Sequence, residues 1–355
     1  MSDALKNCRE QIDAIDEQLL KLVNERAKLA REIGSLKQGG PIYRPEREAQ
    51  VLRRLMENNA GPLSSEAVTA IFRSVMSNCR ALEKELTVAF LGPLGTFSEE
   101  AANKQFGDLS APAQCATIDE VFHMVETGRV DYGVVPVENS TEGAVGRTLD
   151  LLMATSLNIC GEIELPVHHN LLFKGTEKSR IRKLYSHAQS LSQCHEWLNQ
   201  NLPDVERQAV ASNAEAARLA ATENGAAAVA SRRAAELFDL QLVAENIEDD
   251  PKNTTRFLVL ATHDVAPSGR DKTSLVLATK NVPGAMVELL TPLAEHQVSM
   301  TKLESRPSRM GMWEYVFFMD IEGHHQDVSV ASALAELQQK SSWLKVLGSY
   351  PIAVI

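Results

Sequence analysis

The feature that most constrains this chain is an unusually long apolar stripe near its N-terminus. Hydrophobic side chains recur at intervals of three and four residues, at positions 5, 8, 12, 15, 19, 22, 29, 33 and 36. This spacing is that of an α-helix, and nothing breaks it before Gln38-Gly39-Gly40-Pro41. A helix of about 30 residues far exceeds the average of about 11–12, so one small domain cannot bury its stripe. We therefore expect this helix to pack against a second copy of the chain.

One position breaks the stripe, because residue 26 should be apolar and is Arg26. A guanidinium in a helix seam requires an anionic partner, since an unpaired buried charge is very costly. Two further helices are predicted, one from Pro45 to about Asn58 and one from about Ser64 to Leu86. On periodicity alone, a dimeric coiled coil that tolerates this arginine remains the alternative.

The spacing Arg9-(x)16-Arg26-(x)10-Lys37, followed by PEREAQVL and the third helix, resembles the all-helical chorismate mutases, which are domain-swapped dimers. The resemblance covers residues 1–86, which we expect to form an obligate dimer with its own active site. It implies a Claisen rearrangement of chorismate to prephenate, in which two arginines clamp two carboxylates and Lys37 donates to the ether oxygen.

By resemblance, the chorismate-binding residues are Arg9 of the partner chain, Arg26, Lys37, Arg44, Glu48, Cys79 and Glu83, and the catalytic ones are Lys37 and Glu83. Glu48 would bind the ring hydroxyl. Two positions depart from the commonest pattern. Glu83 stands where many members have a glutamine donor, so it can donate only when protonated, and Arg44 stands where an aspartate often precedes the second helix.

From Thr87 to about Ala261, short β-rich runs alternate with helical stretches. Thr117-Ile118-Asp119-Glu120 and Ser212-Asn213-Ala214-Glu215 are predicted capping boxes at helix starts. Alternation of this length predicts an α/β unit of two lobes with parallel sheets. A site is expected in the cleft between the lobes, at the carboxyl ends of strands.

Four polar clusters lie at strand boundaries of this region: GPLGTFS at 92–98, PVENS at 136–140, SHAQ at 186–189 with QC at 193–194, and NTTRF at 253–257. Each alone fits an ordinary turn, cap or structural histidine, and Arg256 could merely pair with Glu248, Asp249 or Asp250. Together and in this order they resemble prephenate dehydratase, over residues 87–263, with a fold like that of type 2 periplasmic binding proteins. That family removes CO₂ and the ring hydroxyl from prephenate to give phenylpyruvate.

By resemblance, Thr255 is the catalytic hydroxyl, and the prephenate-binding residues are Thr96, Ser98, Glu138, Asn139, Ser140, His187, Gln189 and Arg256. Thr255 is best interpreted as a hydrogen-bond donor to the leaving group, because a threonine is a poor acid. The sequence does not identify the group that delivers the proton.

After a linker at 264–272, residues 273–350 show the βαββαβ order of a ferredoxin-like α+β unit. Its NVPGAM and ESRP segments resemble the ligand loops of the ACT domains fused to prephenate dehydratases. The implied phenylalanine-binding residues are Asn281, Pro283, Gly284, Ala285, Met286, Glu304, Ser305 and Arg306. The effector would lie at the interface between two such domains and inhibit the enzyme by feedback.

Composition limits the remaining possibilities. The net charge of -11 argues against nucleic-acid binding, and five scattered cysteines without a CxxC motif fit a reducing cytoplasm and no metal site. We expect neither a cofactor nor a membrane span. The whole order resembles the bifunctional chorismate mutase/prephenate dehydratases of phenylalanine biosynthesis, as a homodimer or higher oligomer. The alternatives are an arogenate-preferring dehydratase and a non-catalytic, amino-acid-responsive binding protein.

Overall fold

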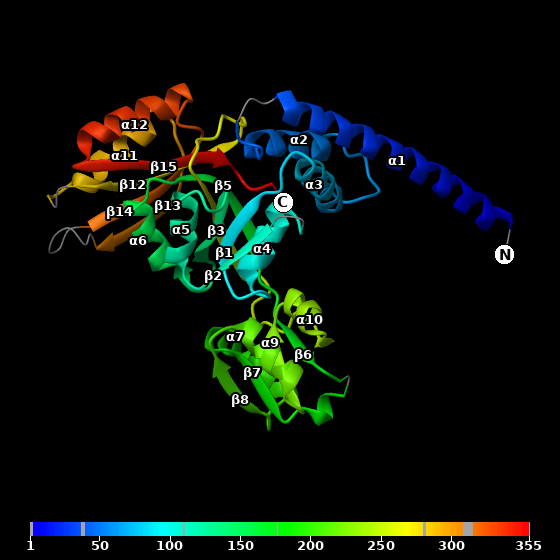
Figure 1. Ribbon diagram of the computed structural model, residues 1–355. Helices are drawn as coiled ribbons and strands as arrows, with labels where there is room; N and C mark the ends of the chain where they lie inside the picture. The colour runs from blue at the N-terminus through cyan, green and yellow to red at the C-terminus, as the bar shows by residue number, and fades with distance from the viewer. Residues whose placement is uncertain are drawn as a thin grey trace.

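The computed structural model describes residues 3–36, 40–108, 111–175, 177–279, 282–307 and 315–354. These residues form three modules in chain order (Figure 1). We name them the helical module (residues 3–81), the two-lobed module (87–261) and the C-terminal module (271–351). Their all-α, α/β and α+β architectures confirm the predicted fold classes.

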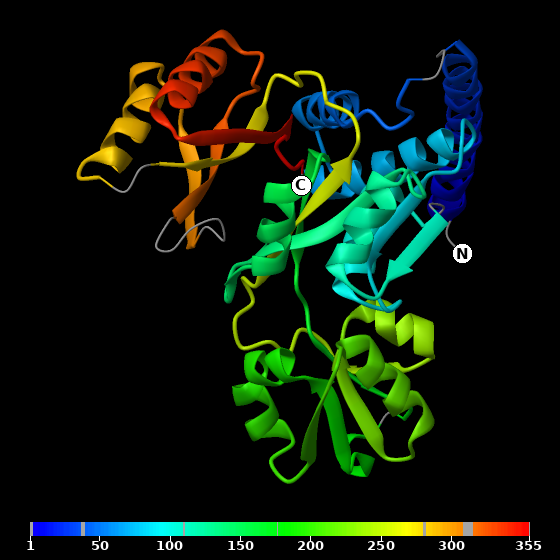
Figure 2. The same cartoon turned by 60° about the vertical axis from the view of Figure 1, so that its left-hand side comes forward.

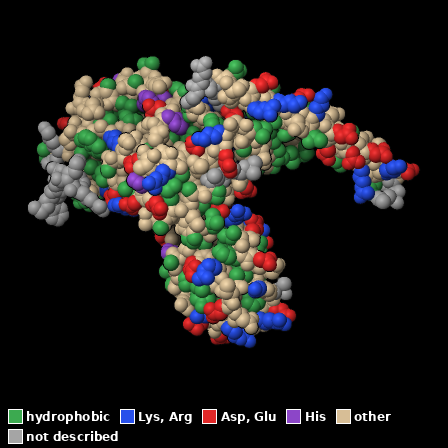
Figure 3. Space-filling view, in the orientation of Figure 1, with side chains coloured by type: hydrophobic (Ala, Val, Ile, Leu, Met, Phe, Trp, Pro, Cys, Tyr) green, Lys and Arg blue, Asp and Glu red, His purple; other side chains and the backbone are tan. Residues whose placement is uncertain are grey.

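The helical module consists of α1 (Asp3–Leu36), α2 (Pro45–Glu57) and α3 (Ser65–Ala81). Pro45 lies in the first turn of α2, and the Ser64 hydroxyl caps α3 by accepting the Ala67 N–H. Both helices therefore begin where the sequence predicted. Helix α1 is 34 residues long and extends from the molecule as an arm (Figure 1 and Figure 3).

The apolar stripe of α1 stays largely uncovered by the other described residues. No described residue of this helix is buried, and the exposed fractions of Ile12, Leu19 and Leu29 are 56%, 53% and 59%. A continuous exposed apolar face of this kind marks an interaction surface.

The first lobe of the two-lobed module is built on a mixed sheet. Its strand order is β2 (Ala111–Cys115), β1 (Thr87–Leu91), β3 (Tyr132–Asn139), β11 (Thr254–Ala261) and β5 (Asn158–Pro166), with β4 (Gly143–Ala144) paired to β3. The helices of this lobe are α4 (Phe97–Phe106), α5 (Ile118–Glu126) and α6 (Gly146–Ala154). The Thr117 hydroxyl caps α5 as predicted.

The second lobe has a separate sheet, in the order β10 (Gln241–Ala244), β6 (Asn170–Phe173), β9 (Ala226–Ala230), β7 (Lys183–His187) and β8 (Glu206–Val210). Its helices are the short 3₁₀ helix η1 (Lys178–Arg180), α7 (Ala188–Gln193), α8 (His195–Asn201), α9 (Asn213–Thr222) and α10 (Arg232–Phe238). Ser212 caps α9 as predicted. The chain passes between the lobes twice, after β5 and before β11 (Figure 2).

The prediction of parallel sheets is wrong for part of each lobe. Strand β1 is parallel to β2 and β3, and β7 is parallel to β8 and β9. Strand β11 instead runs antiparallel to β3 and β5, and β6 runs antiparallel to β9 and β10. The double crossing explains the difference, because a strand that enters from the other lobe arrives from the opposite direction to strands joined by helices within a lobe.

The C-terminal module contains β12 (Asp271–Ala278), α11 (Ala285–Glu295), β13 (Met300–Pro307), β14 (Tyr315–Glu322), α12 (Val328–Lys340) and β15 (Trp343–Pro351). All pairings are antiparallel, in the order β13-β14-β12-β15, which confirms the ferredoxin-like unit. The sheet face away from α11 and α12 shares a core with the first lobe, where Leu258 clusters with Val276 and Phe318.

The helical module also shares a core with the first lobe. Tyr43, in the segment between α1 and α2, is only 1% exposed. Its ring packs edge-on against Phe106 and Tyr132, with ring centroids 5.1 and 5.4 Å apart. All three modules therefore meet on the first lobe. Within the described ranges, no helix is long and apolar enough to cross a membrane.

Candidate active sites

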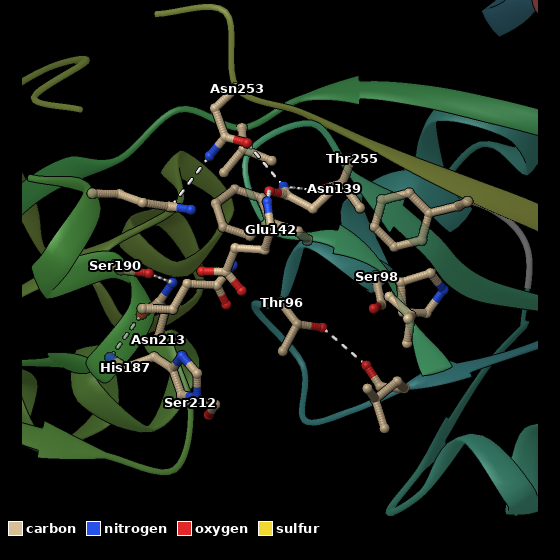
Figure 4. Close-up of a pocket in the computed structure, with 18 of the residues that line it drawn as sticks. Thr96, Ser98, Asn139, Glu142, His187, Ser190, Ser212, Asn213, Asn253 and Thr255 are labelled. Carbon is tan, nitrogen blue, oxygen red and sulfur yellow. Dashed lines mark hydrogen bonds between the residues drawn. The ribbon is translucent and has the colours of Figure 1, made fainter. Parts of the chain in front are cut away.

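A cavity of about 620 Å³ lies between the two lobes, and we call it the interlobe cleft (Figure 4). The first lobe contributes the turn between β1 and α4, the end of β3 and the start of β11. The second lobe contributes the ends of β7 and β8 and the starts of the helices that follow them. Six predicted residues line this cleft together: Thr96, Ser98, Asn139, His187, Gln189 and Thr255.

Thr255 and Asn139 are the central pair of the cleft. They are cross-strand neighbours in β11 and β3, and Asn139 Nδ2 donates a hydrogen bond of 2.8 Å to Thr255 Oγ1. The side-chain amide of Asn139 has a fixed orientation, because its Oδ1 accepts from the backbone N–H groups of Thr141 and Glu142. Since Thr255 Oγ1 accepts from this amide, its own proton is available to donate into the cleft.

A chain of side chains connects this pair to the second lobe. Asn139 Nδ2 also donates to Asn253 Oδ1 at 2.8 Å, and Asn253 Nδ2 donates to Gln193 Oε1 at 3.2 Å. Gln193 Nε2 donates to the Thr141 hydroxyl across the cleft. His169 Nε2 contacts Gln193 Oε1 at 2.8 Å, and burial lowers the pKa of His169, so its imidazole is neutral near pH 7.

Two other groups shape the ends of the cleft. The Thr96 hydroxyl caps α4 and donates to the Leu91 carbonyl, so it serves the turn itself. Asn213 organises the second lobe, since its Oδ1 accepts from the Ser186 hydroxyl and the His187 N–H while its Nδ2 donates to Ser190. Figure 4 shows Ser190, Asn213 and His187 on the side of the cleft opposite Thr96 and Ser98.

A second cavity, of about 470 Å³, lies between α1, α2 and α3, and we call it the helical-module cavity. The predicted residues Arg26, Arg44, Glu48, Cys79 and Glu83 line it together. Lys37 lies outside the described residues. Arg9 lies on the distant part of the α1 arm and does not line this cavity.

Glu48 is the buried anion of this cavity. Its carboxylate forms an ion pair with Arg80 at 3.0 Å, and the guanidinium of Arg80 stacks on Tyr43 and donates to the Phe106 carbonyl. Burial raises the pKa of Glu48, and the positive charges of Arg80 and Arg73 oppose that rise. Arg80 was not among the predicted residues, although its position one residue after Cys79 could have suggested it.

Glu83 lies against α1 at the edge of the same cavity. A Cβ atom at Gly34 would lie 2.8 Å from Glu83 Cγ, so this glycine leaves the space that the carboxylate side chain occupies. Glu83 follows α3, which ends at Ala81, and its side chain lines the cavity.

Comparison with known proteins gives the same three modules. Residues 8–84 match chorismate mutase type II, residues 88–265 match prephenate dehydratase, and residues 273–339 match the ACT domain. A bifunctional chorismate mutase/prephenate dehydratase of Neisseria gonorrhoeae is 54% identical over 350 residues, covering 98% of this chain and 97% of that protein. The protein of that description from Escherichia coli is 36% identical over 367 residues, covering 97% and 95%.

The chain belongs to the bifunctional chorismate mutase/prephenate dehydratase family.

A solved structure of prephenate dehydratase from Arthrobacter aurescens, in complex with L-Phe, is 33% identical with a TM-score of 0.70. The match covers 76% of this chain and 90% of that one. As a bifunctional chorismate mutase/prephenate dehydratase, this protein catalyses both reactions in phenylalanine biosynthesis. These matches exclude the alternative of a non-catalytic binding protein. Among the described residues, no cluster of His, Cys, Asp or Glu could hold a metal ion.

The position of Arg256 in the dehydratase module contradicts the prediction that it binds prephenate in the cleft. Successive side chains of a strand point to opposite faces, so Thr255 faces the cleft while Arg256 faces the C-terminal module. Arg256 Nε donates to Glu162 at 2.8 Å, and its two Nη atoms donate to Asp320 at 2.6 Å and to the Tyr350 hydroxyl at 2.9 Å. Arg256 therefore neither holds a carboxylate in the cleft nor pairs with Glu248, Asp249 or Asp250.

Two more predicted prephenate ligands also lie outside the cleft. Glu138, which precedes Asn139 on β3, forms an ion pair with Lys302 of β13 at 2.6 Å. The Ser140 hydroxyl accepts the Thr254 N–H and fixes the strand ends. Glu138 lies outside the cleft because successive side chains of β3 point to opposite faces, and the next residue, Asn139, faces the cleft.

The predicted effector segments of the ACT domain lie at one end of its sheet. Ala278, just before the first segment, and Arg306, in the second, both pair with Val316 of β14. Gly284 has a φ of 85° at the start of α11, which favours glycine. The described part of the two segments also contains Pro283, Ala285, Met286, Glu304 and Ser305. Asn281 lies outside the described residues.

Arg306 of the second segment contacts the dehydratase module. Its guanidinium lies over Gly146 at the start of α6 and donates to Asp150 at 3.3 Å. Its contact with phenylalanine stays a prediction.

Sequence reasoning also missed several cleft residues: His169, Ser190, Gln193, Asn213 and Asn253. Gln193 and Asn253 lie inside the motifs that revealed the family, which was a usable signal. Ser190 directly follows the SHAQ motif and Asn213 lies in the predicted capping box at 212–215, so both had a local signal, whereas nothing local marked His169.

Proposed function

We propose that Thr255 donates its hydroxyl proton as a hydrogen bond to the departing hydroxyl of prephenate. The bond to the ring carboxylate breaks as CO₂ forms, its electron pair completes the aromatic ring, and the hydroxyl leaves as hydroxide, which takes up a proton from water. The observation that carries this role is the Asn139 amide, which occupies an acceptor site of Thr255 Oγ1 and directs its proton into the cleft.

Replacement of the hydroxyl tests this role. Thr255→Ala is expected to lower prephenate turnover by at least about 100-fold, whereas Thr255→Ser keeps a donor at the same place and retains most activity. Chorismate turnover by each variant is the internal control. Full dehydratase activity in Thr255→Ala would reject the assignment.

We propose that the helical-module cavity binds chorismate, with Arg26 on one carboxylate and Glu48 accepting from the ring hydroxyl. The second carboxylate is held by Arg9 of another copy, because the α1 arm of one chain carries Arg9 away from its own cavity. The uncovered apolar face of α1 supports this exchange of arms between two copies.

We further propose L-phenylalanine as the inhibitor bound by the C-terminal module. The related structure from Arthrobacter aurescens was determined with L-Phe, and this chain carries both segments that resemble the ligand loops. Two ion pairs join β13, which bears the second segment, to the first lobe: Lys302 with Glu138 and Arg306 with Asp150. Because Glu138 precedes Asn139, these contacts give an effector on β13 a route to the interlobe cleft.

Lys302→Met tests the coupling separately from the binding. We expect phenylalanine still to bind, as measured by calorimetry, while the concentration that half-inhibits the dehydratase rises at least about fivefold. Lys340→Met, at the exposed end of α12, is the matched control. If Lys302→Met leaves inhibition intact, the route through Glu138 is wrong.

A further inference from the structure

Glu162 on β5 is a buried carboxylate at the point where all three modules meet. Its side chain is 0% exposed, yet it belongs to neither of the two cavities described above. It accepts from Arg256 Nε at 2.8 Å, from Lys272 Nζ at 2.8 and 3.0 Å, and from the backbone N–H of Ala353 at 3.2 Å. A buried carboxylate is retained only when its charge and its lone pairs are satisfied in this way.

Each donor comes from a different segment of the molecule. Arg256 lies on β11 of the two-lobed module, and Lys272 lies on β12 of the C-terminal module. Ala353 belongs to the residues after β15, 352–354, which we call the C-terminal tail and which run past the helical module. Glu162 is therefore the acceptor that these three segments share.

One of these contacts leads directly to the dehydratase site. The guanidinium of Arg256 is held by Glu162, Asp320 and Tyr350 together. Thr255 is the preceding residue on β11 and has its side chain in the cleft. With Arg256 fixed behind the strand, the backbone that carries the Thr255 hydroxyl has little freedom to shift.

Another contact leads to the mutase site through the C-terminal tail. Next to Ala353, the Val354 carbonyl accepts from Arg73 of α3, and the Ile352 carbonyl accepts from Arg53 of α2 at 3.1 Å. Arg73 is one of the three cations, with Arg80 and Arg26, that oppose the effect of burial on the pKa of Glu48. A small cavity is lined by Glu48, Arg73, Glu162 and the tail, so these groups adjoin one another.

We propose that Glu162 is a positioning residue shared by both active sites: through Arg256 it fixes the strand behind Thr255, and through Ala353 it seats the C-terminal tail against Arg73 beside Glu48. The proposal rests on the roles given above to Thr255 and Glu48. It requires the negative charge of Glu162, because two of its donors are cations and an amide would leave them partly uncompensated.

The first experiment compares Glu162→Gln with Glu164→Gln in the full chain. Glu164 lies two residues along the same strand with its side chain exposed, so it receives the same change without the contacts. In Glu162→Gln we expect dehydratase kcat to fall at least about tenfold, because small displacements of a catalytic group are costly. The KM for prephenate should stay within about twofold, because binding depends on other residues, whereas a general loss of structure would change both kcat and KM.

The second experiment breaks only the contact to the tail. Ala353→Pro removes the backbone N–H that Glu162 accepts, and Ala353→Ser keeps it. We expect mutase kcat/KM to fall about tenfold in Ala353→Pro alone, with dehydratase constants unchanged in both variants. This second experiment leaves Glu162 in place, so its result does not depend on the folding of Glu162→Gln. If Glu162→Gln does not accumulate as folded protein, Glu162→Asp replaces it in the first experiment.

The outcomes separate this proposal from the proposed function. If dehydratase kcat in Glu162→Gln equals that of Glu164→Gln, or mutase activity in Ala353→Pro equals that of Ala353→Ser, the corresponding half of the proposal is overturned. If Thr255→Ala keeps its dehydratase activity, the proposed role of Thr255 is wrong, and that conclusion does not depend on the result for Glu162.

Discussion

The two active sites of this chain differ in how much of each a single chain supplies. The interlobe cleft is enclosed by two lobes of one chain, and its central groups, Asn139 and Thr255, are hydrogen-bonded neighbours. The helical-module cavity has one wall made by α1, whose apolar face is exposed along its length. The dehydratase cleft is therefore formed within one chain, whereas the proposed mutase site takes Arg9 from a second copy.

The largest effect is expected from mixing two inactive mutase variants. Arg9→Ala and Arg26→Ala should each lower chorismate turnover by at least about 100-fold, because each leaves a carboxylate without its bidentate partner. If Arg9 acts in the partner's cavity, co-expressed chains form heterodimers with one intact site, and about a quarter of the wild-type rate returns. The rate of the co-expressed mixture is compared with those of the separate variants.

The interlobe cleft supplies the contrasting control. Co-expression of Thr255→Ala with Asn139→Ala should restore no dehydratase activity, because both residues lie in the same chain's cleft. Restoration of the dehydratase, or no restoration of the mutase, would contradict the comparison between the two sites.

The sequence predicted the positions of helices and strands better than it predicted which way their side chains point. The apolar period of α1, the proline that begins α2 and the capping hydroxyls of α5 and α9 are local signals, and the structure has each of them. The motif NTTRF located the dehydratase strand, but assigning both Thr255 and Arg256 to one cleft ignored the alternation of side chains along β11. The edge strands β2 and β10 give weak sequence signals, because both are short and β2 contains a proline, which edge strands tolerate.

Contacts between modules were beyond reach of sequence reasoning. Nothing near Tyr43 indicates that its ring enters a core with Phe106 and Tyr132 of the first lobe. Such pairs join segments that are distant in sequence, so they depend on how the modules pack rather than on local pattern.

Tyr43→Ala should show how far the helical module depends on the first lobe. Truncation of a fully buried aromatic ring costs about 3–5 kcal/mol of unfolding free energy, and it also removes the surface on which Arg80 stacks. We expect a lower denaturation midpoint and reduced mutase activity in the full chain. Tyr43→Phe, which keeps the ring, is the control, and a midpoint as high as that of the wild type in Tyr43→Ala would show that the two modules are independent.

Arg80→Met should change the pH dependence of the mutase alone. Burial raises the pKa of Glu48 and Arg80 opposes the rise, so removal of the cation raises that pKa further. Because the ionised carboxylate is the form that accepts the ring hydroxyl, activity is lost as pH falls through this pKa. The acid limb of mutase kcat/KM should therefore move to higher pH, while the dehydratase profile, measured on the same protein, stays in place. An acid limb that does not move would remove Arg80 from this role.

The smallest effect is expected from Glu83→Gln, at the edge of the helical-module cavity beside Gly34. An ionised carboxylate there would repel the negative charge that develops on the ether oxygen of chorismate, whereas an amide donates a hydrogen bond at every pH. We therefore expect mutase kcat/KM at pH 8 to be about two- to tenfold higher in Glu83→Gln than in the wild type. The interlobe cleft does not include Glu83, so the dehydratase constants should not change. Equal mutase kcat/KM for the two proteins would show that Glu83 lines the cavity without acting on the ether oxygen.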